Sequence, residues 1–269
     1  MSVSDRAFTH AIPKLYEMYL VPLLFEPYAV DLVARLASRP VTRVLEIAAG
    51  TGVVTRRMAN ILPTNVAIVA TDLNQAMLDQ AAAVGTARPV EWRQADAKAL
   101  PFADGSFDAV VCQFGAMFFP DRSAAFSEAR RVLRAGGIFL FSVWDRIEAN
   151  ELADLIESAV GPLFPTDPPR FLSRVAYGYY DRPTIERDVT SGGFSAPRVE
   201  TVAARSRASS ARGPAVGYVQ GSPLRNEIEA RDALRLDEAT DVATEAIAQK
   251  FGHGPVDAKI QAHVVTVER

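Results

Sequence analysis

Short apolar runs alternate with amphipathic segments between residues 41 and 144. The runs are too short for helices, whereas the segments between them carry apolar side chains at helical spacing, so the pattern predicts strands separated by helices. The predicted strands cover residues 44–47, 66–70, 90–93, 107–114 and 138–143, and the predicted helices cover residues 53–62, 74–84 and 122–133. Repeated strand and helix units indicate a parallel sheet covered on both faces, with right-handed crossovers.

The alternation stops after Trp144, and the flanking parts of the chain are predicted to be mainly helical. Up to residue 38, apolar side chains recur at helical intervals, and Pro22 and Pro27 interrupt this pattern between two helices. Gly136 and Gly137 are expected to form a stop before the fifth strand. Further helices are predicted at residues 151–160, 184–191 and 237–251, and further strands at residues 198–206 and 260–268.

We therefore expect an α/β fold: a Rossmann-like, seven-stranded, mostly parallel sheet with helices on both faces and a helical cap. A chain of 269 residues that is 49% hydrophobic can bury one large core, so a single domain is predicted. Its expected parts are an N-terminal helical cap (1–39), a ligand-binding core (40–145), a cap insertion (146–185), and the C-terminal part of the core with a further helical insertion (186–269). The cap is expected to lie over the carboxyl edge of the sheet.

Composition argues against several classes of function. A formal net charge of −3 provides no basic surface, so nucleic acid is not the expected partner. No apolar run is long enough to span a bilayer and the N-terminus does not resemble a signal peptide, so we expect no membrane span and a cytoplasmic location. The single cysteine, Cys112, excludes an internal disulfide and is predicted to be buried in the fourth apolar run. The protein is expected to be a monomer or a homodimer.

The first predicted strand runs into the turn Ala48-Ala49-Gly50-Thr51-Gly52, and a predicted helix follows. Such a turn presents free backbone N–H groups to a ligand, because glycine has no Cβ to keep the ligand away. In an open α/β sheet, ligands bind outside the carboxyl ends of the strands. Asp72, which ends the second strand, can accept hydrogen bonds from both hydroxyls of a ribose. Asp96, after the third strand, can accept one from an adenine amino group.

Five landmarks occur in the order typical of the class I S-adenosylmethionine-dependent methyltransferases. They are Glu46 to Gly52, Asp72, residues 94–97, residues 100–102 with 107–108, and residues 133–137. On these landmarks, about residues 41 to 145 resemble this family, in particular its branch of ubiquinone/menaquinone-biosynthesis enzymes and their small-molecule relatives. The resemblance implies S-adenosyl-L-methionine as the cofactor and methyl transfer to a small molecule as the activity.

The resemblance also implies roles for individual residues. Glu46 and the turn Gly50-Thr51-Gly52 would face the methionine moiety, near the carbonyl of Gln113. Asp72 would hold the ribose, Leu73 would pack near the adenine, and Asp96 with the Ala97 amide would read the adenine edge. The remaining residues of the predicted cofactor site are Tyr19 (in the cap), Ala48, Met77 and Phe114. The family more often has glycine where this chain has Ala48, so the turn is expected to begin slightly less open.

The expected reaction is an in-line displacement, for which positioning and desolvation suffice. No catalytic residue and no metal site is identified, because one cysteine and the scattered histidines His10, His253 and His263 have no metal-ligand spacing. His10 is the one histidine that could approach a substrate as a base. The predicted cap is rich in aromatic residues, which favours a small apolar or aromatic acceptor.

Two other functions stay open at this point. A nicotinamide-dependent oxidoreductase also has a glycine turn and a ribose-binding acid, although Thr55 stands where such enzymes have a third glycine. A non-catalytic module that binds S-adenosylmethionine would have the same fold and the same site residues.

Overall fold

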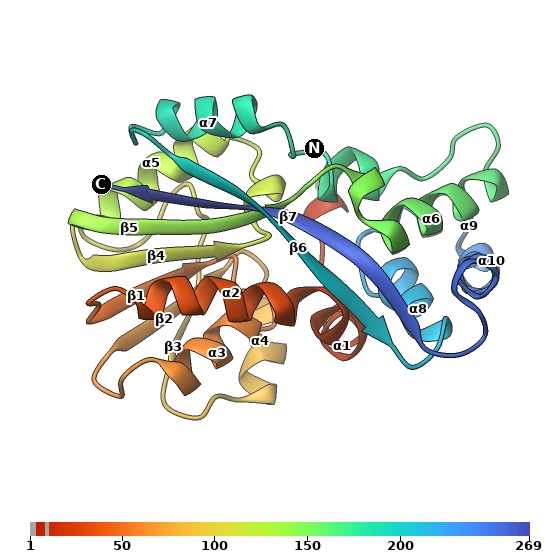
Figure 1. Ribbon diagram of the computed structural model, residues 1–269, viewed down its shortest axis with the longest axis horizontal. Coiled ribbons are helices and arrows are strands. Elements are labelled where there is room, and N and C mark those ends of the chain that lie inside the picture. Colours follow the sequence, from red (N-terminus) through yellow and green to blue (C-terminus); the bar gives the residue numbers. More distant parts are fainter. Residues whose placement is uncertain (1–3, 9–10) are drawn as a thin grey trace. The chain divides into compact units, whose positions relative to one another are not determined.

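The computed structural model describes residues 4–8 and 11–269, and its seven strands form one sheet in the order β3-β2-β1-β4-β5-β7-β6 (Figure 1). The strands are β1 (Arg43–Ile47), β2 (Ala67–Asp72), β3 (Glu91–Gln94), β4 (Phe107–Gln113), β5 (Leu133–Trp144), β6 (Arg198–Ala208) and β7 (Val256–Glu268). Strands β1 to β5 pair in parallel. Strand β7 runs antiparallel to β5, because the Gly136 amide donates to Arg269 and the Asp145 amide donates to Gln261. The predicted seven-stranded, mostly parallel sheet is confirmed.

The chain divides into two compact units, each assembled from separate stretches of sequence. Unit 1 comprises Met1–Pro27, Trp144–Tyr179 and Ala203–Gln261, and unit 2 comprises Tyr28–Val143, Tyr180–Val202 and Ala262–Arg269. Two stretches were predicted to form the cap, residues 1–39 and residues 146–185. Of these, residues 1–27 and 146–179 belong to unit 1. The position of this cap over the sheet stays a prediction.

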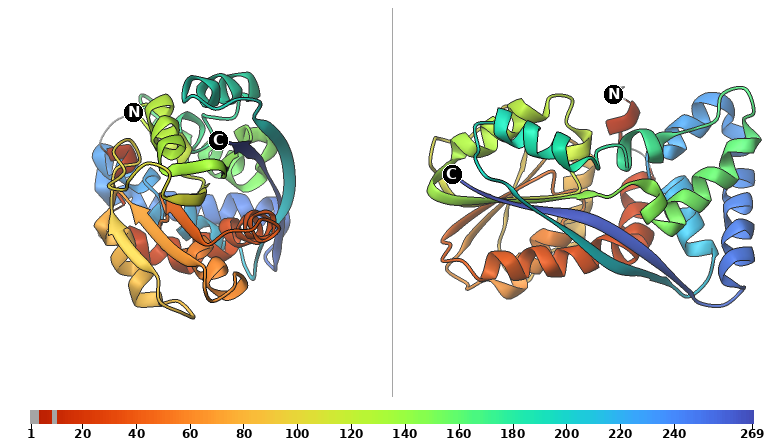
Figure 2. Two further views of the ribbon diagram at one scale, coloured as in Figure 1. Left: turned by 90° about the vertical axis from the view of Figure 1, so that its left-hand side faces the viewer. Right: turned by 45° about the horizontal axis from the view of Figure 1, so that its top comes forward.

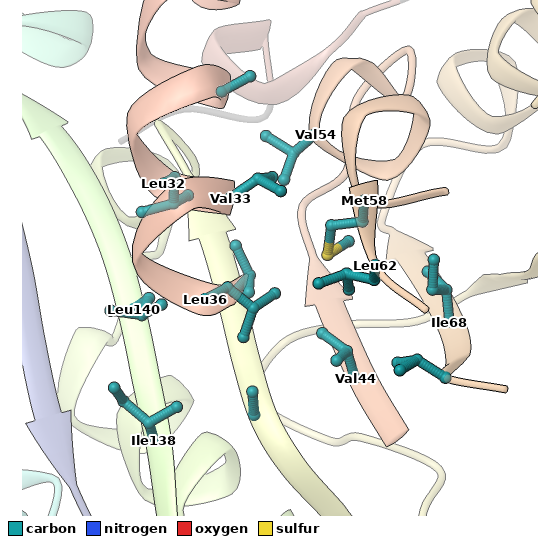
Figure 3. Packing of buried hydrophobic residues seen from close by; sticks show 14 of the residues in the cluster. Leu32, Val33, Leu36, Val44, Val54, Met58, Leu62, Ile68, Ile138 and Leu140 are labelled. Atoms are coloured by element: carbon teal, nitrogen blue, oxygen red, sulfur yellow. The ribbon is translucent and has the colours of Figure 1, made fainter. Parts of the chain in front are cut away.

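In unit 2, helices cover both faces of the sheet. Helices α2 (Glu26–Ala37), α3 (Val53–Ile61) and α4 (Gln75–Val84) lie on one face, and α5 (Arg122–Val132) and α7 (Arg182–Ser191) lie on the other (Figures 1 and 2). The first face buries side chains of α2, α3 and the central strands, among them Leu36, Met58 and Leu140 (Figure 3). On the second face, the ring of Phe126 packs against that of Phe141, with 5.1 Å between their centroids. Leu140 and Phe141 are neighbours in β5, so their opposite orientations follow from the two-residue period of a strand.

Unit 1 consists mainly of helices. Its α-helices are α1 (Ile12–Leu15), α6 (Glu151–Val160), α8 (Arg212–Gln220), α9 (Leu224–Asp232) and α10 (Leu236–Phe251). The π-helical stretch η2 (Tyr16–Phe25) packs on α8, and α10 packs on both α8 and α6. Short π- and 3₁₀-helical turns make up η1 (Ser4–Arg6), η4 (Ile147–Ala149), η5 (Gly161–Leu163), η6 (Leu172–Ala176) and η7 (Ala233–Arg235), and η3 (Ala116–Phe118) follows β4 in unit 2.

The prediction that Pro22 and Pro27 separate two helices was wrong. The backbone stays helical from α1 through η2 into α2, with Pro22 inside η2 and Pro27 in the first turn of α2. At the junction, the Glu26 amide donates to the Val21 carbonyl five residues back. This wide π-type turn accommodates residues that cannot donate the usual helical hydrogen bond.

Gly136 and Gly137 were also assigned wrongly, since they lie inside β5 rather than before it. Phe107 pairs with Leu133 and Ala109 pairs with Ile138, so β5 has three more residues than β4 between the same two pairs. The extra residues bulge out of the ladder, and Gly136 takes a φ of +73° there. The bulge lets the strand begin five residues before its regular apolar part.

Cys112, predicted to be buried, and His263 both lie in strands of the sheet. Cys112 is fully buried in β4, and burial raises the pKa of its thiol to about 12. His263 lies in β7, and its Nδ1 shares a hydrogen bond of 3.0 Å with the Thr201 hydroxyl. None of the helices in residues 4–8 and 11–269 has the length and hydropathy needed to span a lipid bilayer.

Asp108 ties the start of β1 to β4. Its Oδ2 accepts hydrogen bonds from the Thr42 amide, the Thr42 hydroxyl (2.7 Å) and the Arg43 amide (3.0 Å). Its Oδ1 lies 2.9 Å from a guanidinium nitrogen of Arg134. Burial by itself raises the pKa of Asp108, but the hydrogen bonds from Thr42 and Arg43 outweigh it, so the pKa lies below its usual value. The carboxylate is therefore part of the framework of the sheet.

We expect Asp108→Ala to lower the free energy of unfolding by about 2–3 kcal/mol, because three hydrogen bonds from Thr42 and Arg43 and the ion pair with Arg134 all lose their acceptor. The matched control is Asp104→Ala, which removes a carboxylate that is 75% exposed and paired with Arg131. This control should cost no more than about 1 kcal/mol. Urea denaturation of both variants measures the difference, and equal losses would contradict the role of Asp108.

Candidate functional site

The candidate site lies in unit 2, at the carboxyl ends of β1, β2 and β4. In the sheet, β1 lies between β2 and β4. The next strand along the chain, β2, pairs with β1 on one side, and the later strand β4 pairs with it on the other side. The order of strands reverses at this point, which is where open α/β sheets bind ligands. Of the predicted cofactor-site residues, all except Tyr19 belong to unit 2.

The turn after β1 is built from residues with left-handed backbone conformations. Ala48, Gly50 and Gly52 have φ values of +53°, +57° and +85°. The Gly52 amide donates to the Ala49 carbonyl (2.9 Å), which closes the turn directly before α3. A Cβ on Gly52 would lie 2.8 Å from Cη2 of Trp92. Glycine is thus required here both by the backbone and by the neighbouring ring.

Ala48 lies against a glycine that sequence reasoning missed. A Cβ on Gly115 would overlap the Cβ of Ala48 and would lie 2.8 Å from the sulfur of Cys112. The methyl group of Ala48 therefore fills space that the absence of a side chain at Gly115 leaves free. No sequence motif marks Gly115, because the contact joins the ends of β1 and β4.

Asp72 connects the ends of β1 and β2. Its Oδ2 accepts a hydrogen bond from the Gly50 amide and its Oδ1 accepts one from the Asn74 amide, each 2.8 Å long. The side chain is buried, and burial raises the pKa of Asp72 above its usual value. Each carboxylate oxygen can accept more than one hydrogen bond, so the pair can still receive two hydroxyls. The next residue, Leu73, is 42% exposed and offers apolar surface beside the carboxylate.

Glu46 is the other buried acid of the site, with 1% of its surface exposed. Burial raises its pKa to about 8, against a hydrogen bond from the Thr55 hydroxyl and the positive charge of Arg56, which both lower it. The negative charge of Asp72 raises it further. Below about pH 8, the side chain of Glu46 is therefore mostly neutral. The hydroxyl of Thr55 donates a hydrogen bond to this carboxyl group. From the sequence, Thr55 was considered only because it stands where oxidoreductases have a third glycine.

Asp96 and Ala97 follow β3, in a loop. Oδ1 of Asp96 accepts a hydrogen bond from the Lys98 amide (2.9 Å), and its side chain is 42% exposed. In the structure Asp96 thus caps its own loop, and its predicted hydrogen bond to adenine stays a prediction. Ala97 is partly exposed in the same loop.

Gln113, Phe114 and Met77 are largely buried around the same strand ends. Gln113 is the last residue of β4, and Phe114 follows it with a φ of +51°. The ring of Phe114 packs edge-on against that of Tyr28, with 5.2 Å between the centroids. Met77 lies in the first turn of α4 and is 3% exposed.

The two remaining candidates, Tyr19 and His10, belong to the stretch Met1–Pro27 of unit 1. Tyr19 lies in η2 of unit 1, where its Cβ would be 3.1 Å from a Cβ on Gly217 of α8. Its predicted contact with a cofactor or substrate stays a prediction. His10, the candidate base, lies outside the described residues. Within residues 4–8 and 11–269, His, Cys, Asp and Glu side chains form no group of three or more that could hold a metal ion.

In sequence, the chain is similar to known methyltransferases. The sequence profile of the methyltransferase domain family matches residues 45–141. A ubiquinone/menaquinone biosynthesis C-methyltransferase from Teredinibacter turnerae is 31% identical over 170 residues, which are 58% of this chain and 68% of that protein. An uncharacterised protein from Mycobacterium tuberculosis is 38% identical over 120 residues, 44% of this chain and 43% of that protein. The match thus spans less than half of this mycobacterial relative.

A solved structure shows the same fold over nearly the whole chain. It is phosphoethanolamine N-methyltransferase 2 from Haemonchus contortus, in complex with phosphomonomethylethanolamine and S-adenosylhomocysteine. The TM-score is 0.61 at 18% sequence identity, with 98% of this chain and 59% of that chain covered.

The residues at the strand ends fit S-adenosylmethionine. The hydroxyl oxygen of Thr51 is buried and has no hydrogen-bond partner among residues 4–8 and 11–269, so the glycine turn offers a polar group that a ligand can satisfy. Gly52 lets the Trp92 ring pack directly against the backbone of the turn, which holds the turn in place beside the strand ends. Asp72 offers acceptors for a ribose, and the buried acid Glu46 offers a counter-charge for an ammonium group. These groups match the polar parts of a nucleoside linked to an amino acid.

We expect Gly52→Ala to weaken binding of S-adenosylhomocysteine at least about tenfold and to destabilise the protein by about 2–3 kcal/mol, because the new Cβ collides with Trp92. Gly136→Ala is the matched control, since Gly136 has a similar φ of +73° but no atom within 4 Å of the added Cβ. It should show only the backbone cost of about 1 kcal/mol and unchanged binding. Calorimetric titration and thermal unfolding measure both effects. If the two variants bind equally well, the close approach at Gly52 has no role in binding.

The buried acid Glu46 should make the stability of the protein depend on pH. The pKa of Glu46 is about 8 in the folded protein and about 4.5 when unfolded, so the folded state binds more protons between these values. Its contribution to stability is complete below about pH 4.5 and is lost as the pH rises through about 8, with a slope of up to about 1.4 kcal/mol per pH unit.

Glu46→Gln should remove this part of the slope, whereas Glu91→Gln on the exposed side of β3 should leave the profile as in the wild type. Urea denaturation of the ligand-free protein at pH 5 to 9 measures it. A Glu46→Gln profile parallel to that of the wild type would show that Glu46 does not titrate in this range.

Proposed function

The chain belongs to the class I S-adenosylmethionine-dependent methyltransferases, and we propose that it transfers the methyl group of S-adenosyl-L-methionine to a small apolar or aromatic acceptor. The observation that carries this proposal is the Asp72 carboxylate, held by the Gly50 and Asn74 amides beside the glycine turn. In our proposal this carboxylate binds the ribose, and the adjoining glycine turn meets the methionine moiety.

When bound, S-adenosylmethionine supplies a methyl group that is already activated by its sulfonium, so that an acceptor atom can form a bond to the methyl carbon as the carbon–sulfur bond breaks. The chain's own contribution is to bind and orient. Asp72 accepts hydrogen bonds from the ribose, and the turn, held by the Asp72 bond to Gly50 and by Trp92 against Gly52, orients the methionine moiety. Glu46 supplies the counter-charge for the ammonium group. The fully buried strand ends around Glu46 exclude water from this part of the site.

A nicotinamide-dependent oxidoreductase is not favoured. Enzymes of that class need a third glycine for close packing of the first helix on the sheet. In this protein the corresponding position is Thr55, and its hydroxyl is bound to Glu46. The non-catalytic binding module shares all features of the site and differs from the enzyme only in turnover.

The proposal also covers the partner, the location and the oligomeric state of the protein. The net charge of −3 supports a small molecule rather than a nucleic acid as the partner. We infer a cytoplasmic monomer or homodimer. The name of the Teredinibacter turnerae relative, a C-methyltransferase of quinone biosynthesis, supports an acceptor with an apolar or aromatic character.

The test combines binding with turnover. We expect S-adenosylmethionine and S-adenosylhomocysteine to bind with one site per chain in calorimetric titrations. Incubation with isotopically labelled S-adenosylmethionine and a metabolite extract, followed by mass spectrometry, should reveal a methylated small molecule. Absence of binding to the folded protein would overturn the proposal. Binding without any labelled product in extracts of varied composition would favour the non-catalytic module.

Asp72→Ala should weaken cofactor binding about 100-fold or more, because both ribose hydroxyls lose their acceptor and the Gly50 amide is left unpaired. Asp79→Ala is the matched control, since Asp79 lies exposed on α4 and its carboxylate bonds only to Gln75 among the described residues. This control should bind and turn over like the wild type. Unchanged binding by Asp72→Ala would remove the basis for assigning the ribose site.

A further inference from the structure

The hydroxyl group of Thr55 lies in the first turn of α3 and is fully buried. It donates a hydrogen bond to Oε2 of Glu46 on β1. A threonine inside a helix often bonds instead to the carbonyl four residues back. Here that carbonyl, of Thr51, accepts a hydrogen bond from the guanidinium of Arg56 (2.6 Å). The Thr55 hydroxyl instead points across the interface between helix and strand, to Glu46.

The surroundings of Glu46 make this hydrogen bond important. In the sheet, Glu46 lies between Ala70 of β2 and Val111 of β4, which are apolar. The charged or titratable groups that act on its carboxyl group are Arg56 from α3, Asp72 from β2 and Cys112 from β4. Arg56 favours a negative charge on Glu46, whereas Asp72 disfavours it. The effects of Arg56 and Asp72 on the Glu46 carboxylate thus oppose each other. The hydrogen bond from the neutral Thr55 hydroxyl adds to the effect of Arg56 and stabilises the charged carboxylate directly.

We propose that Thr55 is a positioning residue for the cofactor: its hydroxyl holds the Glu46 carboxylate in place to receive the ammonium group of the methionine moiety. The inference rests on the proposed function, and it assigns to the first turn of α3 a part in binding that goes beyond the backbone of the glycine turn. Thr55 acts through Glu46 and does not contact the cofactor itself.

One consequence is a coupling between binding and proton release. Burial keeps the pKa of Glu46 at about 8, so at pH 7 the free protein carries mostly neutral Glu46. An ammonium ligand pairs with the charged form, so its binding releases about one proton per site. The hydrogen bond from Thr55 stabilises the charged form and thereby makes this release easier. Without it, the affinity should reach its upper limit only at a higher pH.

The experiment compares Thr55→Val, which removes the donor at nearly constant volume, with Thr55→Ser, which keeps it. The probe is S-adenosylhomocysteine, which has the same ammonium group and ribose as the cofactor. Calorimetric titrations from pH 6 to 9, in pairs of buffers with different ionisation enthalpies, give affinity and protons released. For Thr55→Val we expect about tenfold weaker binding at pH 7 and a shift of the pH midpoint upward from about 8. Thr55→Ser should bind within about threefold of the wild type with the same midpoint.

A Glu46→Gln background separates positioning from a general structural effect. In this background proton release should disappear, and Thr55→Val should no longer shift the midpoint. Equal weakening by Thr55→Val at every pH, with an unchanged midpoint, would overturn the proposal because it indicates only a disturbed helix.

The ligand-free protein provides a readout that does not depend on the cofactor. Thr55→Val should leave the onset of the fall in stability unchanged but extend its upper end beyond about pH 8, and Thr55→Ser should not. One outcome is that the wild type does not bind S-adenosylhomocysteine but Thr55→Val still changes the pH dependence of stability. In that case the proposed function fails, although Thr55 does affect the pKa of Glu46. If the wild type binds and Thr55→Val shows neither shift, only the positioning role fails.

Discussion

The arrangement of the site depends on the hydrogen bond from the Gly50 amide to the carboxylate of Asp72. This bond joins the end of β2 to the turn that follows β1, while the same carboxylate receives the Asn74 amide at the start of α4. A single acid thus sets the geometry at two strand ends and at the entry to a helix. The turn needs such support, because three of its residues have left-handed backbone conformations and one of them, Ala48, carries a Cβ.

The same arrangement places two acids in low-dielectric surroundings on adjacent strands. Burial raises the pKa of both Glu46 and Asp72, and the charge of Asp72 raises that of Glu46 further. Two buried acids are costly for a sheet that needs only apolar contacts to be stable. They are understandable where a ligand brings an ammonium group and two hydroxyls to the same strand ends. On the proposed function, binding of the cofactor would offset part of the cost of burying these two acids.

Much of the core could be predicted from sequence because its signals are local. The alternation of apolar runs with helical segments placed β1 to β5 and α3 to α5, and the glycine turn and Asp72 are recognisable by their position at strand ends. The failures arise where glycine or proline hides a local pattern or where only strand pairing reveals the structure. Pro22 lies in a π-helical stretch, Gly136 lies in a bulge that only the pairing of β4 with β5 reveals, and α8 was missed because Gly213, Pro214 and Gly217 obscure its pattern.

The site shows the same division between local and non-local signals. Residues at strand ends were found by motif, whereas Gly115 and Thr55 act through contacts with other strands or helices that no spacing in the sequence encodes. A glycine whose purpose is to admit the methyl group of Ala48 looks like any other glycine. A threonine in an amphipathic helix looks like a residue of intermediate propensity.

The strand order has a consequence for how the protein is made. Strand β7 follows all other strands along the chain, yet in the sheet it lies between β5 and β6. Strand β6, at the edge, pairs with no other strand of the sheet, so during synthesis it has no partner until residues 256–268 have left the ribosome. The antiparallel insertion of β7 is therefore a late step of folding, with long loop closure and slow, non-local pairing. Until then, β5 has an open edge and β6 has no partner, and unpaired strands of this kind are prone to aggregation.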